Sequence, residues 1–146
     1  MDYKKIGDSI YARFDKGDEI LEEILGICKK ENILSATFSG IGGCGDVTVS
    51  TLIPETNEFL PHHKEGCLLE MISINGNISA DDNDEIFEHT HAIFSYLENR
   101  EVKFIGGHLT RAVVSYTAEI EIKPVQNGVI RRKQDENTGI TVWKLA

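Results

Sequence analysis

Apolar residues recur at helical spacing in one segment of the chain, residues 19–30, and the charged residues between them face the other way. Glutamates stand near the start of this segment and lysines at its end, which is the distribution that the helix dipole favours. Asn32 follows as a stop signal. The segment therefore predicts a helix whose buried stripe consists of Ile20, Leu21, Ile24, Leu25 and Cys28.

Alternating and β-branched segments predict strands on both sides of this helix. The clearest is Arg111–Ile122, where apolar residues occupy every second position. Residues 86–97 are ambiguous, because their apolar positions fit a helix as well as a strand. The other expected strands are residues 10–14, 34–39, 47–53 and 67–79 (with a turn signal at Asn75-Gly76), and two short strands in the tail around a polar loop at residues 135–139.

The connections between these strands carry glycine and polar residues. The segment Gly40–Gly45 formally matches the GxGxxG pattern of dinucleotide-binding proteins, but a β-branched segment follows it where such a site needs a helix. We therefore expect a glycine-rich bend between two strands and no bound nucleotide. Residues 54–66 are expected to form a polar connection that holds His62 and His63 in an exposed loop.

Composition limits the classes of function. With 146 residues the chain has the length of one domain, and its formal net charge of −9 opposes binding to nucleic-acid phosphates. Its basic groups are short, at residues 29–30 and 131–133, so direct DNA binding is not expected. No signal-peptide or membrane-spanning pattern is present, and the three cysteines form no CxxC motif. These features predict a single-domain cytoplasmic protein with reduced thiols and no membrane attachment.

Three histidines form the best candidate for a chemical site. His89 and His91 would share one face of a strand, whereas on a helix they would point to roughly opposite faces. His108 follows Gly106-Gly107, a pair that lets the backbone bend or approach another group closely. If the two segments lie side by side, three neutral imidazoles converge and leave one position open, as in first-row metal sites, most often zinc. The alternative is that these histidines only satisfy hydrogen bonds in the core or on the surface.

One carboxylate is also a candidate for a role near this site. Glu70 lies between apolar residues of an expected strand. A carboxylate in that setting either faces solvent or meets a cation. Arg13 and a metal-bound imidazole are the two candidate partners.

A series of motifs along nearly the whole chain resembles the plant and prokaryote conserved (PPC) domain family. The motifs are Arg13 with Gly17-Asp18, GIGGCGDV at residues 40–47, the segment Glu70–Ile78, His89-Thr90-His91, Gly106-Gly107-His108-Leu109, Thr117-Ala118-Glu119, and Arg132, Asp135, Thr138 and Gly139 near the end. HxH followed by GGHL and TAE is fairly specific in combination. The resemblance implies an α/β (α+β) fold with an antiparallel sheet, one or two packed helices, a strand at the HxH motif and assembly as a homotrimer.

The chain departs from the family pattern in two ways. The connection from His91 to Gly106 is longer than usual and carries Leu97–Arg100 where a glycine turn is typical. There is no Arg-Gly-Arg AT-hook, the element with which plant relatives read the minor groove of DNA. The resemblance therefore implies one PPC-like domain over residues 1–146, of the stand-alone type.

Three functions remain open. The first, which we favour, is a trimeric module that carries a divalent metal, zinc, on His89, His91 and His108, with the DNA-binding, transcription-regulatory or assembly role that the resemblance implies. The second is a metal-dependent hydrolase or lyase, in which Glu70 or Glu119 acts as the base beside a zinc-bound water. The third is a metal-free interaction module whose partner is a protein or a small molecule.

Overall fold

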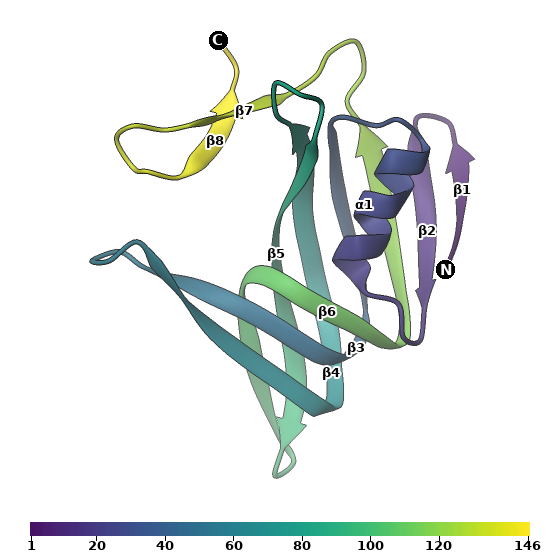
Figure 1. Cartoon of the computed structure of the whole chain (residues 1–146). Coiled ribbons are helices and arrows are strands. Elements are labelled where there is room, and N and C mark those ends of the chain that lie inside the picture. The colour runs from purple at the N-terminus through teal and green to yellow at the C-terminus, as the bar shows by residue number, and fades with distance from the viewer.

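The computed structural model describes residues 1–146 and consists of one sheet and one helix (Figure 1). All but one of the strand pairings are antiparallel, which confirms the expected fold class. The elements are β1 (Asp2–Ile6), β2 (Ser9–Asp15), α1 (Ile20–Lys30), β3 (Ala36–Ile53), β4 (Glu58–Ala80), β5 (Ile86–Glu98), β6 (Glu101–Pro124), β7 (Arg131–Gln134) and β8 (Thr141–Lys144).

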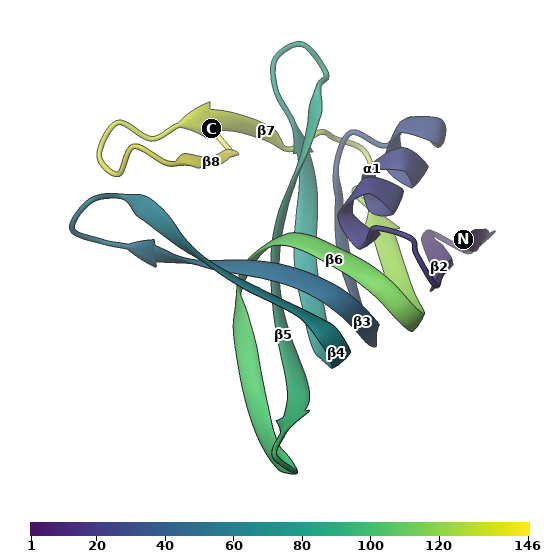
Figure 2. The same ribbon diagram turned by 60° about the horizontal axis from the view of Figure 1, so that its bottom comes forward.

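The four longest strands pair in a closed circuit, which we call the closed sheet (β3–β6). β3 pairs with β4 and β6, and β5 also pairs with β4 and β6. β2 and then β1 extend the sheet from β6, and the hairpin formed by β7 and β8 adjoins the end of β4. Figures 1 and 2 show that the long strands bend strongly, so that their two halves run in different directions.

The helix begins and ends as the sequence predicts. The Glu19 carboxylate accepts hydrogen bonds from the backbone N–H groups of Glu22 and Ala112, both at 2.8 Å, and so ties the helix start to β6. At the other end Asn32 takes a φ of 56°, and the Ile33 N–H bonds to the Cys28 carbonyl at 2.8 Å, which closes the helix. The 11-residue α1 is too short to cross a membrane.

The core lies between α1 and the sheet. Twenty-eight buried apolar side chains form one cluster, to which the helix, the closed sheet and β2 all contribute. On β5 the side chains of Thr90, Ala92 and Phe94 are buried, whereas His89 and His91, on either side of Thr90, are exposed. The alternation of a strand therefore places the HxH histidines on the face of β5 that points away from the core.

Two expected breaks are continuous strand. The glycine-rich segment does not separate two strands, because β3 runs through it with register shifts between Gly40 and Gly42 and between Cys44 and Asp46. The Asn75-Gly76 pair is not a turn but lies inside β4, and a side chain at Gly76 would collide with the Phe38 ring. Glycine is needed there for close packing between strands, which has the same sequence signature as a turn.

Two further segments also prove to be strand. Most of the expected polar connection at residues 54–66 belongs to β4, so His62 and His63 are exposed on a strand and not in a loop. The ambiguous segment is β5, as the family resemblance implies. Its connection to β6 is a two-residue hairpin turn, because Asn99 and Arg100 both have positive φ and Glu98 pairs with Glu101.

Candidate metal centre

The three candidate histidines lie where β6 changes its pairing partner from β5 to β3. His91 on β5 is opposite Asn75 of β4 on one side and opposite His108 of β6 on the other. His108 is in turn opposite Ser50 of β3. His89 lies two residues before His91 on the same face of β5. Strand register alone therefore brings the three imidazoles together.

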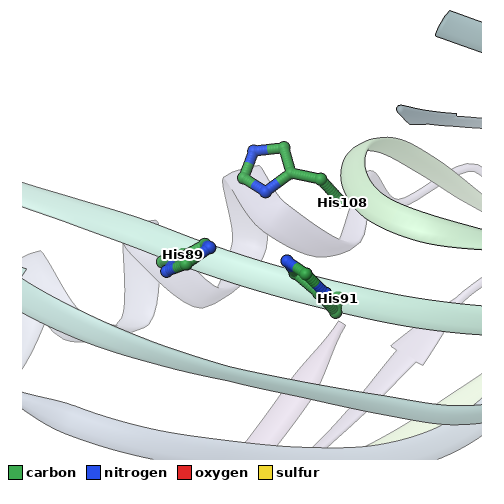
Figure 3. Close-up of side chains that lie close together, drawn as sticks. All are labelled: His89, His91 and His108. Carbon is green, nitrogen blue, oxygen red and sulfur yellow. The ribbon is translucent and has the colours of Figure 1, made fainter. Parts of the chain in front are cut away.

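The imidazole side chains point toward one another (Figure 3). One nitrogen from each of the three imidazoles lies within 4.8 Å of the others. The ring centroids of His89 are 5.3 Å from those of His91 and His108, and the last two are 5.5 Å apart. Zinc binds imidazole nitrogen at about 2.0–2.1 Å, so the three nitrogens would have to move somewhat closer together to share one ion. The donor set fits a first-row divalent metal with one position left open.

Gly107 allows His108 to take its place. Its φ is 152°, a conformation that side chains disfavour, and a Cβ there would lie 2.6 Å from the Ser50 carbonyl oxygen. The backbone of β6 approaches β3 this closely directly before the histidine. The second glycine of the GGHL motif thus has a steric role, because only glycine fits at the position directly before the candidate ligand His108.

We expect the Gly107→Ala variant to be less stable than the wild type by about 1–3 kcal/mol, through backbone strain and the clash with Ser50. His108 should move with the distorted strand, so zinc affinity should fall as well. Urea unfolding and zinc titration measure the two effects. The matched control is Gly26→Ala in α1, where a Cβ meets no atom within 4 Å and helix propensity improves. Equal stability and zinc affinity in the two variants would contradict this account of Gly107.

The electrostatics of the site favour neutral imidazoles. The pKa of His89 lies below its usual value, mainly because the side chain is partly buried. Charge repulsion from His108, His91 and Arg132 lowers this pKa further. Burial and the neighbouring His91 likewise lower the pKa of His108. Neutral imidazole is the form that coordinates a metal, so these two residues are in the ligating form at neutral pH.

Other side chains surround the histidines. The Phe59 ring lies over His108, with 5.2 Å between the ring centroids. Asn77 of β4 is directly opposite His89, and its Oδ1 accepts hydrogen bonds from Arg132 at 3.2 Å and from Trp143 at 3.1 Å. The sequence interpretation missed Phe59, Asn77 and Trp143. Only the strand register and the docking of the C-terminal hairpin reveal their positions.

The two candidate catalytic carboxylates do not join this cluster. Glu70 is opposite Ser95, four residues along β5 from His91, which corresponds to about 13 Å of strand. Glu119 is opposite Arg13 of β2 and Ile41 of β3. Glu70 and Glu119 line one shallow depression elsewhere on the sheet. The expected pairing of Glu70 with Arg13 is also absent, because Arg13 binds Asp15 at 3.0 Å.

A second group of side chains has a possible ligand set. Asp46, His63 and Glu65 each place one potential ligand atom, a ring nitrogen or a carboxylate oxygen, within 4.8 Å of the others. However, Arg111 Nε donates a hydrogen bond of 2.8 Å to Asp46 Oδ2, a terminal guanidinium nitrogen forms an ion pair with the same oxygen at 2.8 Å, and the His63 ring bonds to the Thr48 hydroxyl at 2.9 Å. Arg111 and Thr48 therefore bind part of this group, and Asp46 Oδ1 is buried without a hydrogen-bond partner, whereas the three-histidine cluster contains no carboxylate.

Comparisons with known proteins agree with the motifs. The chain matches the family model of the Plants and Prokaryotes Conserved (PCC) domain over residues 1–126. No curated protein matches it. A solved plant- and prokaryote-conserved (PPC) protein from Pyrococcus horikoshii is 30% identical, with a TM-score of 0.81 over 99% of this chain and 96% of that chain.

Two further solved structures have the same fold. One, named a metal-containing protein, is from Archaeoglobus fulgidus and is 26% identical, with a TM-score of 0.81 over 99% of both chains. The other, named a "putative DNA binding protein", is from Bacteroides thetaiotaomicron and is 24% identical, with a TM-score of 0.85 over 98% of this chain and 96% of that chain. Since the family model covers most of the chain, the protein belongs to the Plants and Prokaryotes Conserved domain family.

Proposed function

We propose that the protein is a homotrimeric regulatory module that holds one divalent metal ion, zinc, per chain on His89, His91 and His108. The observation that carries the proposal is the convergence of the three imidazoles from two strands, with one nitrogen of each within 4.8 Å of the others. A bound zinc would supply a Lewis-acidic position open to a ligand. The Archaeoglobus fulgidus neighbour, named as metal-containing, supports the choice of a metal.

The surface of the sheet supports self-association. Ile41 and Ile72 line the shallow depression that also contains Glu70 and Glu119, and their side chains are 57% and 47% exposed. Leu68 and Tyr116, also exposed, flank Gly43 nearby. We call Ile41, Leu68, Ile72 and Tyr116 the apolar patch. Exposed apolar side chains gathered on one part of a sheet are typical of an interface, and a closed trimer would cover them on every chain.

Charge argues against direct binding of this module to DNA. The net charge is −9, and the two arginines of the basic group at residues 131–133 are partly buried and bonded to other side chains. Arg131 pairs with Asp84 at 2.6 Å, and Arg132 bonds to Ser79 and Asn77. With this net charge and only short basic groups, the counterion-release contribution to DNA affinity is small. A regulatory role suggested by the names of the structural neighbours would therefore act through a partner or a ligand.

An enzyme is the weaker candidate. A hydrolase or lyase that uses a zinc-bound water needs a base within hydrogen-bonding reach of that water. The carboxylates Glu70 and Glu119 lie away from the histidines of their own chain. Ligand binding at the open metal position requires no such base.

Zinc binding should depend on pH with a defined sign. Because burial lowers the pKa of His89 and His108, both remain neutral at pH 7, and affinity should change little between pH 7 and 8. Below the imidazole pKa values protons compete with the metal, and affinity should fall by about tenfold per protonated ligand for each pH unit. Isothermal titration of metal-free protein at several pH values measures this. Affinity that is unchanged down to pH 5 would exclude histidine ligands, as would elemental analysis that finds no zinc.

A further inference from the structure

We propose that the three-histidine centre binds a small oxyanion, a carboxylate or a phosphate, between the open metal position and the guanidinium of Arg132. This inference rests on the metal site proposed above and names the class of ligand that the site takes. Its basis is an arginine that lies beside the histidines and lacks a carboxylate partner.

Arg132 is held on the same face of the sheet as the histidines. Its Nε donates a hydrogen bond to the Ser79 hydroxyl, and a terminal nitrogen donates to Asn77 Oδ1 at 3.2 Å. Asn77 and Ser79 are two residues apart on β4, so their side chains lie on the same face of the sheet. Asn77 is directly opposite His89 on β5. The guanidinium is therefore separated from the His89 imidazole by one cross-strand neighbour. The same proximity makes Arg132 one of the causes that lower the His89 pKa.

The charge of Arg132 is not neutralised by an ion pair. Two arginines of the chain are partly buried, Arg131 and Arg132. Arg131 forms a 2.6 Å salt bridge with Asp84, whereas both groups that bind Arg132 are neutral. The nearest carboxylate that influences it is Glu88, which accepts a hydrogen bond from Thr90 and whose own pKa is raised by burial. A guanidinium partly withdrawn from water without an anion carries a desolvation cost, and a bound anion would offset it.

The sum of charges points to the same ligand. Three neutral imidazoles leave a divalent ion with its full charge, and Arg132 adds a further positive charge beside it. An oxyanion can coordinate the metal through one oxygen and accept hydrogen bonds from the guanidinium through another, the geometry that arginine provides for carboxylate and phosphate. A neutral ligand of the same shape would gain only the first contact.

Other side chains lie close to the histidines, so we expect the ligand to be a small molecule. The Phe59 ring packs near the His108 ring, and Trp143 donates a hydrogen bond to Asn77, the residue opposite His89. The tip of the β3–β4 hairpin also meets the C-terminal hairpin, since the Asn57 side chain donates to the Thr138 carbonyl at 3.1 Å. Figures 1 and 2 show these two hairpins projecting to the same side of the molecule. Side chains thus stand on two sides of the histidines.

The experiment uses cobalt(II) as a coloured replacement for zinc. The cobalt-loaded full chain is titrated with acetate, with inorganic phosphate and with acetamide, the neutral counterpart of acetate, while the visible d–d absorption is recorded. We expect saturable changes with at least one anion and none with acetamide. The anion that binds more tightly distinguishes a carboxylate ligand from a phosphate ligand.

Variants assign the effect to one arginine. Arg132→Gln should keep the cobalt stoichiometry but bind the anion about tenfold more weakly or worse, since a charge-assisted contact is lost, and Arg132→Lys should recover part of the affinity. The matched control Arg131→Gln should bind the anion as the wild type does. Cobalt uptake without any response to either anion would overturn this inference alone, as would equal weakening by Arg131→Gln and Arg132→Gln. Failure to take up cobalt would overturn the metal site itself and the inference with it.

Discussion

A variant with both His89 and His108 replaced by alanine is expected to contain no zinc after purification, whereas the wild type contains one ion per chain. Structural zinc sites contribute about 10–16 kcal/mol of binding free energy, so removing two of three protein ligands should weaken binding by more than about a thousandfold. Elemental analysis of dialysed protein measures the stoichiometry. The fold should survive, because the core cluster contains none of the three histidines.

The matched control for this variant is His63→Ala. His63 belongs to the second group of side chains with a possible ligand set, together with Asp46 and Glu65, but Arg111 and Thr48 already bind that group. Zinc content should therefore be unchanged in the control. If zinc persists in the His89→Ala, His108→Ala variant and is lost in His63→Ala, the metal lies at the group of Asp46, His63 and Glu65, and our proposal is refuted.

The Ile72→Asp variant is expected to be a monomer under conditions in which the wild type is a trimer. Ile72 belongs to the apolar patch, and a buried carboxylate without a partner costs several kcal/mol. Threefold symmetry would introduce that cost once per chain. Light scattering coupled to size-exclusion chromatography gives the mass directly.

A second exposed apolar residue serves as the control for the trimer prediction. Leu145, near the C-terminus, is 75% exposed and lies outside the apolar patch, so Leu145→Asp should leave the mass unchanged. A wild-type mass equal to that of one chain would refute the homotrimer. A trimer that persists in Ile72→Asp would instead show that another face of the sheet forms the contacts.

Local sequence signals predict the parts of the fold that depend on neighbouring residues. The helix at Ile20–Lys30 and the alternation in Arg111–Ile122 are confirmed, because periodicity and capping are properties of short segments. The continuity of β3 and β4 is not predictable in the same way. Gly42 and Gly76 look like turn residues in the sequence. In the structure they are glycines because another strand or a ring approaches them closely, and that approach is seen only in the folded chain.

Local patterns likewise predict some residues of the candidate site and not others. The HxH spacing and the GGHL motif identify the three histidines, because strand alternation fixes the first two and the glycine pair marks the third. The positions of Asn77 and Phe59 depend on register between strands far apart in the sequence. Arg132 is visible in the sequence as part of a motif, but nothing local indicates that it lies beside His89.

The C-terminal hairpin gives the site two separable parts. Its only strand pairing with the sheet is a single parallel bridge, between Ala80 and Arg131, and side-chain bonds make the rest of the attachment, whereas every histidine of the candidate metal centre belongs to the extensively paired strands β5 and β6. Segments with few contacts open at a lower free energy than the whole fold. On our proposal, Arg132 and Trp143 could therefore leave and return while the three histidines stay assembled, so changes in the hairpin would alter anion affinity without loss of the metal, whereas loss of the metal would abolish both.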